Sequence, residues 1–276
     1  MPVPNDPPPR FNVLGVGVHA LQLAQARDLI VEAARARSVR GYVCFCDVNS
    51  ISSARRDPQH LTILNQSFLT TPDGMPIVWL GKRSGHRAIE RVYGPDLLLE
   101  VSGATADQPL SHFFYGAGPG TAELLASRLQ ARFPGLSVAG TYTPPFRLPT
   151  SADLDDLEKR IRDAQPHFIW VGLSTPKQER FMADFCPRLP SGIMLGVGAA
   201  FDFLAGRVGQ APRWIQRSGF EWLFRLCTEP RRLAPRYFKN NPLFLLRVAA
   251  QLSGVRQYPL EIPARSSPRR TNTSEF

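Results

Sequence analysis

The sequence has few cysteines and no long apolar run. Its 276 residues include four cysteines, Cys44, Cys46, Cys186 and Cys227, and none has the CxxC or Cys/His spacing of a zinc site. We therefore expect the four cysteines to be small, buried, apolar side chains in a protein kept in a reducing compartment. No stretch of 18 apolar residues occurs, and the start MPVPNDPPPR lacks the basic and apolar regions of a secretory signal. The sequence thus predicts neither a transmembrane helix nor a leader.

Acidic residues are scarce in the last quarter of the chain. The formal net charge is +10, from 33 Lys and Arg against 23 Asp and Glu. Residues 206–276 hold 13 basic and 4 acidic side chains, so that +9 of the +10 lies there. This imbalance predicts an anionic partner for the segment: nucleic acid, an anionic membrane surface or a phosphorylated substrate.

Short apolar stretches alternate with amphipathic ones between residues 11 and 205. The apolar stretches predict strands at residues 11–18, 41–48, 111–116, 136–142, 167–173 and 192–201. Helices are expected between them, including residues 21–36, 49–65 and 151–164. About six strands alternating with helices are typical of an open parallel α/β sheet. We therefore predict a Rossmann-like core at 11–205 after a disordered N-terminus at 1–10.

A glycine pattern near the N-terminus supports one candidate function. Gly15, Gly17 and Ala20 form G-x-G-x-x-A, and Asp47 closes the following predicted strand. This matches the outline of a dinucleotide-binding fingerprint, so an NAD(P)-dependent oxidoreductase is one candidate. Short GxG sequences are also common at strand ends, where His19 could cap or pack, and a purely structural role stays open.

A second glycine-rich turn indicates a phosphate site. Gly116, Gly118 and Gly120 end a predicted strand, and Thr121 opens an amphipathic helix. Backbone N–H groups and the helix dipole at such a junction bind phosphate. Because Thr121 stands where the third glycine of the dinucleotide pattern belongs, the turn favours a nucleotide diphosphate. The alternative is an ordinary turn between strand and helix.

One carboxylate in residues 70–98 is followed by cationic and hydrogen-bonding side chains. Asp73 stands in a Pro-Asp-Gly sequence, and the side chains after it are Lys82, Arg83, His86, Arg87 and Arg91. This arrangement suits chemistry on a phosphate-bearing substrate. The alternative is a type I or II turn with Gly74 at positive φ, in which Asp73 only hydrogen-bonds its own backbone.

An Asp-x-Asp sequence imitates the metal-binding motif of some glycosyltransferases. Asp153 and Asp155 lie in the first turns of a helix that Ser151 is expected to cap, where acidic side chains stabilise the helix dipole in any case. We therefore expect no metal site, and no cofactor.

From residue 206 onward, aromatic and leucine side chains are interleaved with arginines. At helical spacing this mixture predicts short amphipathic helices at a membrane headgroup interface over residues 206–257. Stacking on single-stranded nucleic acid is one alternative. A helical lid whose arginines close over a phosphate is another. Residues 258–276 are rich in Pro, Ser and Arg and predict a disordered tail.

Six stretches together resemble the WecG/TagA/CpsF glycosyltransferases, glycosyltransferase family 26. They keep their order and spacing over about residues 12–250, and they are TPDGMPIVW, ERVYGPDLL, YGAGPGTAE, IWVGLSTPKQE, GVGAAFDFLAG and APRWIQRSGFEWLFRLCTEPRRL. The resemblance implies a Rossmann-like core of the GT-E type. It also implies metal-independent, inverting transfer of a sugar from a UDP-sugar to a lipid diphosphate-linked sugar at the inner membrane face. Teichoic acid linkage units, enterobacterial common antigen and capsular or exported polysaccharides are built in this way.

The resemblance also implies roles for single residues. Asp73 matches the proposed general base of the family, and Asn49 and Arg91 match residues around the same pocket. Asp47 is a departure, because relatives commonly carry Thr there, and the added carboxylate bears on donor choice. Further matches, to motifs that line the nucleotide-sugar cleft, are Gly116, Gly118, Gly120, Thr121, Gln178 and Asp202.

Inverting transfer fits these residue types. One carboxylate such as Asp73 suffices to take the proton of the acceptor hydroxyl. Without a metal, the charge of the departing UDP must be met by arginines and backbone N–H groups. The candidates are the Gly116–Gly120 turn, Arg91, Arg213, Arg217 and Arg225.

The same reasoning sets the expected partners and location. We expect a UDP-sugar donor, a polyprenyl diphosphate-linked sugar acceptor and an anionic membrane surface as partners, and no nucleic acid. A homo-oligomer stays open. The expected location is the cytoplasm, peripheral at the inner face of the cell membrane.

Overall fold

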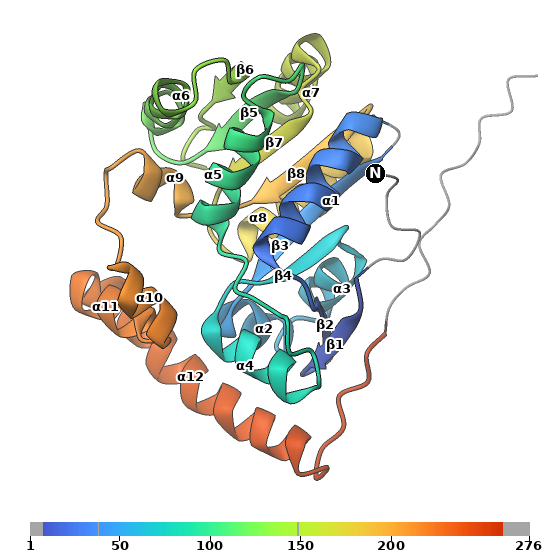
Figure 1. Ribbon diagram of the computed structural model, residues 1–276, viewed down its shortest axis with the longest axis vertical. Helices are drawn as coiled ribbons and strands as arrows, with labels where there is room; N and C mark the ends of the chain where they lie inside the picture. The colour runs from blue at the N-terminus through green and yellow to red at the C-terminus, as the bar shows by residue number, and fades with distance from the viewer. Residues whose placement is uncertain (1–7, 38, 148, 262–276) are drawn as a thin grey trace, which may run out of the picture.

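A six-stranded parallel sheet forms the centre of the molecule (Figure 1). The computed structural model describes residues 8–37, 39–147 and 149–261. The sheet has the order β4-β3-β8-β7-β5-β6, and its strands are β3 (Arg40–Cys46), β4 (Leu69–Pro72), β5 (Ser111–Gly116), β6 (Ser137–Tyr142), β7 (Phe168–Gly172) and β8 (Gly192–Gly196). The predicted fold class, a Rossmann-like open sheet flanked by helices, is confirmed. Because the strands are parallel, the loops that follow them gather at one edge of the sheet.

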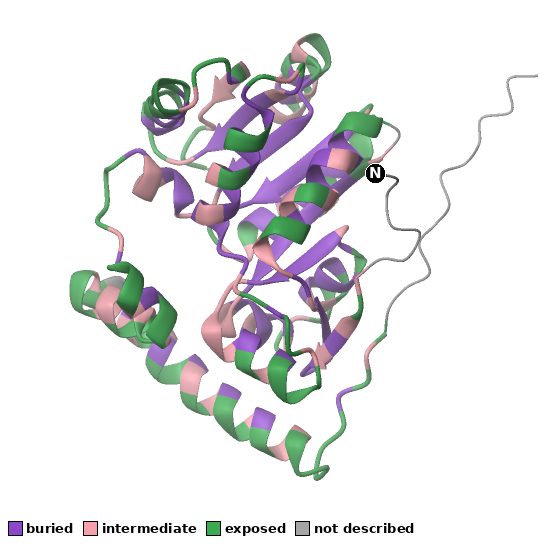
Figure 2. Cartoon of the chain, in the orientation of Figure 1, coloured by how far each residue is buried: buried purple, intermediate pink, exposed green. Residues whose placement is uncertain are grey.

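Alternate side chains of each strand enter two apolar cores, one on each face of the sheet. On β3, Tyr42, Cys44 and Cys46 belong to one core and Val43 and Phe45 to the other. The four inner strands, β3, β8, β7 and β5, are therefore almost wholly buried, with helices on both faces (Figure 2). The Val43 face is covered by α1 (Leu23–Ala36), α5 (Gly94–Thr105), α6 (Thr121–Arg132) and α9 (Ala200–Leu204). The Tyr42 face is covered by α2 (Val48–Ala54), α3 (Pro58–Gln66), α4 (Met75–Arg83), α7 (Ser151–Ala164) and α8 (Lys177–Phe185), which the 3-10 turn η1 (Cys186–Arg188) follows.

The predicted first strand is a hairpin outside the main sheet. Two short strands pair antiparallel here, β1 (Arg10–Val13) and β2 (Val16–His19). Gly15 makes the turn between them with a φ of 88°, a value that favours glycine. Because α1 begins only at Leu23, Gly17 stands in a strand and not at a helix N-terminus that could hold a phosphate. The dinucleotide-binding interpretation of Gly15, Gly17 and Ala20 is therefore wrong, and the oxidoreductase alternative loses its basis.

Other boundaries differ from the prediction in ways that bear on the site. Strand β4, which the sequence analysis did not identify, replaces the hairpin as the sixth strand. The predicted helix at 49–65 is two helices, α2 and α3. The predicted strand at 192–201 ends early, and Asp202 belongs to α9. Thr150, and not Ser151, caps α7.

Three helices follow α9, and they line one side of the molecule (Figure 1). They are α10 (Arg213–Ser218), α11 (Glu221–Thr228) and α12 (Pro230–Leu252). The sequence predicted only short helices here, but α12 has 23 residues. α12 packs along α2, and α11 packs on α12. No helix in the described part of the chain is long and apolar enough to cross a membrane. Cys227 on α11 is exposed, contrary to expectation, whereas the other three cysteines are buried.

The C-terminal end of the described chain packs against the hairpin. The side chain of Asn12 donates to the carbonyl of Tyr258 (2.6 Å), and Tyr258 is only 4% exposed. The predicted tail thus begins on a packed residue, and the rest of it, residues 262–276, lies outside the described residues. Arg10 belongs to β1, so the predicted disorder at 1–10 does not extend to it, and residues 1–7 also lie outside the described part.

Candidate active site

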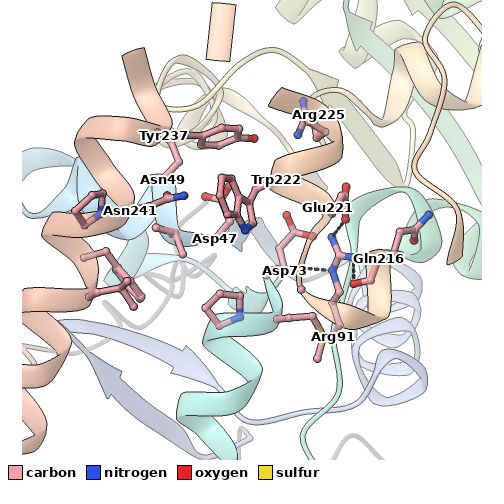
Figure 3. A pocket seen from close by; sticks show the side chains of 18 residues that line it. Asp47, Asn49, Asp73, Arg91, Gln216, Glu221, Trp222, Arg225, Tyr237 and Asn241 are labelled. Carbon is pink, nitrogen blue, oxygen red and sulfur yellow. Dashed lines mark hydrogen bonds and ion pairs between the residues drawn. The ribbon is translucent and has the colours of Figure 1, made fainter. Parts of the chain in front are cut away.

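A cavity of about 430 Å³ lies where the ends of β3 and β4 meet the C-terminal helices (Figure 3). More than half of its lining comes from residues beyond 206. The core contributes Asp47, Val48, Asn49, Asp73, Gly74, Met75, Pro76 and Arg91. The C-terminal helices contribute Gln216, Gly219, Glu221, Trp222, Arg225, Tyr237, Asn241, Pro242, Phe244 and Leu245.

Asp73 enters this cavity from the end of strand β4. Its backbone N–H donates to the carbonyl of Cys46 (3.0 Å), so it extends the pairing of β3 with β4. Gly74 then precedes helix α4 with a φ of −99°. The Pro-Asp-Gly sequence is thus a strand-to-helix junction, and the alternative of a reverse turn with Gly74 at positive φ is wrong. The Oδ1 atom of Asp73 is buried without a hydrogen-bond partner among the described residues, which leaves it able to accept a proton.

The surroundings of Asp73 make it a base suited to neutral pH. Burial raises the pKa of its carboxyl to about 7, against the lowering effect of Arg91. The nearby carboxylates of Asp47 and Glu221 raise this pKa further. A general base is most effective when its pKa lies near the working pH, because it is then both ionised and basic enough to take a proton.

Asp47 and Asn49 are held by contacts outside the cavity as well. Asp47 caps α2 by accepting from the backbone N–H (2.7 Å) and hydroxyl (2.9 Å) of Ser50. The side-chain carbonyl of Asn49 accepts from the amide of Asn240 on α12 (3.0 Å), and Asn240 in turn accepts from Arg56 (2.8 Å). The docking of α12 on the core is therefore linked directly to one wall of the cavity.

The three arginines proposed from the C-terminal sequence lie in different places. Arg225 on α11 lines the cavity, and its Nε is buried without a hydrogen-bond partner among the described residues. Arg213 pairs with Asp96 (2.7 Å). Together with Arg217, it lines a second cavity of about 500 Å³ on the other side of Arg91. Of these three arginines, Arg225 is the one that lines the cavity with Asp73.

The Asp-x-Asp sequence is engaged in local contacts. Asp153 pairs with Arg147 and accepts from the backbone of Thr150 (2.7 Å) at the start of α7. In the described part of the chain, no group of three or more His, Cys, Asp or Glu residues could hold a metal ion.

The model of the WecG/TagA/CpsF glycosyltransferase family matches residues 11–258. The chain belongs to this family. Two similar proteins are each named N-acetylglucosaminyldiphosphoundecaprenol N-acetyl-beta-D-mannosaminyltransferase. That of Bacillus subtilis (strain 168) is 28% identical over 180 residues, 65% of this chain and 68% of the relative. That of Bacillus spizizenii (strain ATCC 23059 / NRRL B-14472 / W23) is 28% identical over 179 residues, again 65% and 68%. The match to the WecG/TagA/CpsF model includes the sheet, the C-terminal helices and the buried Tyr258.

The residues matched to WecG/TagA/CpsF motifs do not all lie in the cavity. Asp73, Asn49, Asp47 and Arg91 meet in the cavity. The turn Gly116–Thr121 follows β5, the fourth strand along from β4, so it lies about 19 Å away at 4.8 Å per strand. It does begin α6 as predicted, with Gly120 as the N-cap at a φ of 71°.

Two further residues predicted for the nucleotide-sugar cleft lie outside this cavity. Gln178 is buried in α8, and its amide donates to the carbonyl of Gly196 (2.8 Å) and to Glu179 (3.0 Å). Its contact with Gly196 ties α8 to the end of β8. Asp202 is half-buried in α9. This helix packs on α6, the helix that begins at the Gly116–Thr121 turn.

Several cavity residues were missed by the sequence analysis. These are Gln216, Glu221, Trp222, Tyr237 and Asn241, all from α10 to α12. Glu221 carried the clearest available indication, because it is one of only four acids in a segment with 13 basic residues.

Proposed function

We propose that this WecG/TagA/CpsF protein is an inverting, metal-independent glycosyltransferase. It would move a sugar from a UDP-sugar to a lipid diphosphate-linked sugar, with Asp73 as the general base. The observation that carries the proposal is the free, buried Oδ1 of Asp73 in a cavity formed with the C-terminal helices. The names of the two Bacillus relatives support the acceptor class, because they specify N-acetylglucosaminyldiphosphoundecaprenol. The test is acceptor-dependent release of UDP, measured with a metal chelator present.

The proposed reaction needs no group beyond side chains and backbone. The acceptor hydroxyl donates to Asp73 Oδ1, and its oxygen attacks the anomeric carbon as the proton passes to the carboxylate. The bond from that carbon to the diphosphate breaks on the opposite face, and the electron pair leaves with UDP. Arg225 lines the same cavity and can stabilise this charge. The backbone N–H groups of the Gly116–Gly120 turn could bind the far end of an extended donor.

The C-terminal helices also fit a role in binding the membrane. Several large apolar side chains on them are exposed, namely Trp214, Phe220, Trp222, Leu223, Phe238, Leu245, Leu246 and Leu252. Leu245 both lines the cavity and is 66% exposed, so the cavity opens onto this apolar surface. An acceptor whose lipid stays in the bilayer could place its sugar beside Asp73 from there. With the basic side chains around it, the surface suits anionic lipid.

Replacing Phe238 and Leu246 together with Glu is expected to weaken binding to anionic vesicles at least about tenfold. Each side chain is mostly exposed, 74% and 69%, and each would lose the free energy of burial in the headgroup region. Sedimentation with phosphatidylglycerol vesicles measures the effect, and Leu124→Glu on the distant α6 is the control. A wild-type protein that does not sediment with these vesicles would rule out this membrane surface.

A further inference from the structure

One acidic side chain of the basic C-terminal segment is directed toward the sheet. Glu221 opens helix α11, and its side chain is only 13% exposed. Figure 3 shows it beside Asp73 and Arg91, on the cavity wall that the C-terminal helices provide. Neither the proposed base nor the proposed leaving-group contact uses this carboxylate, so its burial needs another explanation.

Glu221 binds two side chains of the segment that follows α4. Its Oε2 lies 2.7 Å from Nη2 of Arg91, whose side chain is 16% exposed. Its Oε1 accepts a hydrogen bond from the hydroxyl of Tyr93 (3.0 Å). The guanidinium of Arg91 also lies over the Tyr93 ring, 4.0 Å from its centroid. These contacts fix both the position and the plane of the Arg91 guanidinium.

Arg91 in turn contacts the backbone of the base. Its Nε donates to the carbonyl of Asp73, and its Nη1 donates to the carbonyl of Gln216 on α10 (3.4 Å). All three nitrogens of the guanidinium therefore have partners from the protein itself. Arg91, which the sequence analysis expected to meet the charge of the departing UDP, is held between Asp73 and the C-terminal helices.

We propose that Glu221 is a positioning residue for the transfer reaction. Its carboxylate orients Arg91, and through Arg91 it fixes the backbone that carries Asp73, so the base is correctly placed only when α11 is docked on the core. The inference rests on the proposed function, because it assumes that Asp73 takes the acceptor proton. A buried ion pair contributes little net stability after desolvation, so a role in placement accounts for it better than a role in folding alone.

The charges that face Asp73 give the inference a measurable consequence. Asp47 faces it from α2, Arg91 and Tyr93 from the segment before α5, and Glu221 from α11, while Arg225 lines the same cavity. Glu221 raises the pKa of Asp73 and Arg91 lowers it. Without the charge of Glu221, Arg91 is no longer neutralised, and both changes lower the pKa of Asp73.

Glu221→Gln should therefore shift the pH profile and slow the reaction. In the wild type, kcat/KM is expected to rise with pH through about 7, as Asp73 ionises. In the variant we expect this rise about one pH unit lower. We also expect kcat at pH 8 to fall about tenfold, because the base is weaker and less well placed. The control is Asp96→Asn, which removes another ion pair between core and C-terminal helices, with Arg213, and leaves Arg91 in place.

The outcomes separate this inference from the proposed function. A wild-type protein without acceptor-dependent transfer would contradict the proposed function itself. Transfer that depends on Asp73, with a Glu221→Gln profile and kcat like those of Asp96→Asn, would overturn only the role of Glu221. Should Glu221→Gln not fold, Glu221→Asp keeps the charge but shortens the reach to Arg91. It should lower kcat with the pH profile unmoved, and wild-type kcat in that variant would overturn the inference.

Discussion

Asp73→Asn is expected to lower kcat for transfer by about 10²–10⁴-fold, the range that a general base contributes. The amide has the same shape, but it cannot take the proton of the acceptor hydroxyl. Donor binding should remain, because the contacts proposed for the diphosphate lie elsewhere. The pKa of Asp73 is raised in the folded protein to about 7, so above that pH the wild type carries a buried negative charge that lowers its stability. The variant should then be at least as stable as the wild type at pH 8.

The matched control is Asp47→Asn, which removes a second carboxylate from the same cavity. The Oδ1 atom of Asp47 accepts two hydrogen bonds from Ser50 at the start of α2. Its loss should cost far less than that of Asp73 and should shift the pH profile downward, because Asp47 raises the pKa of Asp73. Kinetics and thermal unfolding of both variants decide the assignment. Full activity of Asp73→Asn, or a larger loss in Asp47→Asn, would contradict it.

Arg225→Gln is expected to lower kcat about 10²–10³-fold, the loss typical of removing one donor from a developing anion. Arg225 faces the cavity with a buried Nε that has no hydrogen-bond partner in the described chain. Glutamine keeps polar hydrogen-bonding atoms but not the charge, so the effect should fall on kcat more than on KM. Steady-state kinetics with a short-chain acceptor measures it.

The comparison variant is Lys239→Gln, which removes one positive charge from the same helical segment. Lys239 is exposed on α12 and does not line the cavity. Its loss should leave kcat for a short-chain acceptor within about twofold of the wild type, as expected for a solvated surface charge. If the two variants lost the same activity, general charge in the segment would explain the effect, and Arg225 would have no specific role.

Most strands of the sheet could be predicted because the pattern that identifies each one lies within its own few residues. Strands such as β7 and β8 are apolar along their whole length, and that pattern is visible in any short window of sequence. Strand β4 was missed because its four residues, Leu69–Pro72, include two threonines and a proline. It is a strand because it pairs with β3, and that contact is not local in the sequence.

The hairpin was misread for a similar reason. Gly15 and Gly17 fit a phosphate-binding pattern, but their surroundings come from residues far away in the sequence. A Cβ atom added at Gly17 would lie 3.0 Å from the Leu260 side chain. The backbone N–H of Gly17 donates to the side-chain carbonyl of Asn65 (2.9 Å). Neither contact can be anticipated from residues 10–20 alone.

The site was predicted from its core side and missed from its C-terminal side. Asp73 and Asn49 follow the strands β4 and β3, and a strand end is where ligand-facing residues are expected. Glu221 joins them from 130 positions beyond Arg91, and the net charge of its segment indicated cations there. The averaged charge of the segment predicted an anionic partner but could not identify Glu221 as an acid directed toward the core.

The most direct test is UDP release from a panel of UDP-sugars, with a short-chain lipid diphosphate-linked sugar as acceptor and EDTA present. We expect one sugar to give release that requires the acceptor, is unchanged by EDTA and disappears in Asp73→Asn. Release that stops on adding EDTA would contradict the metal-independent mechanism. No release with any sugar, from folded protein and intact acceptor, would contradict the proposed transferase activity.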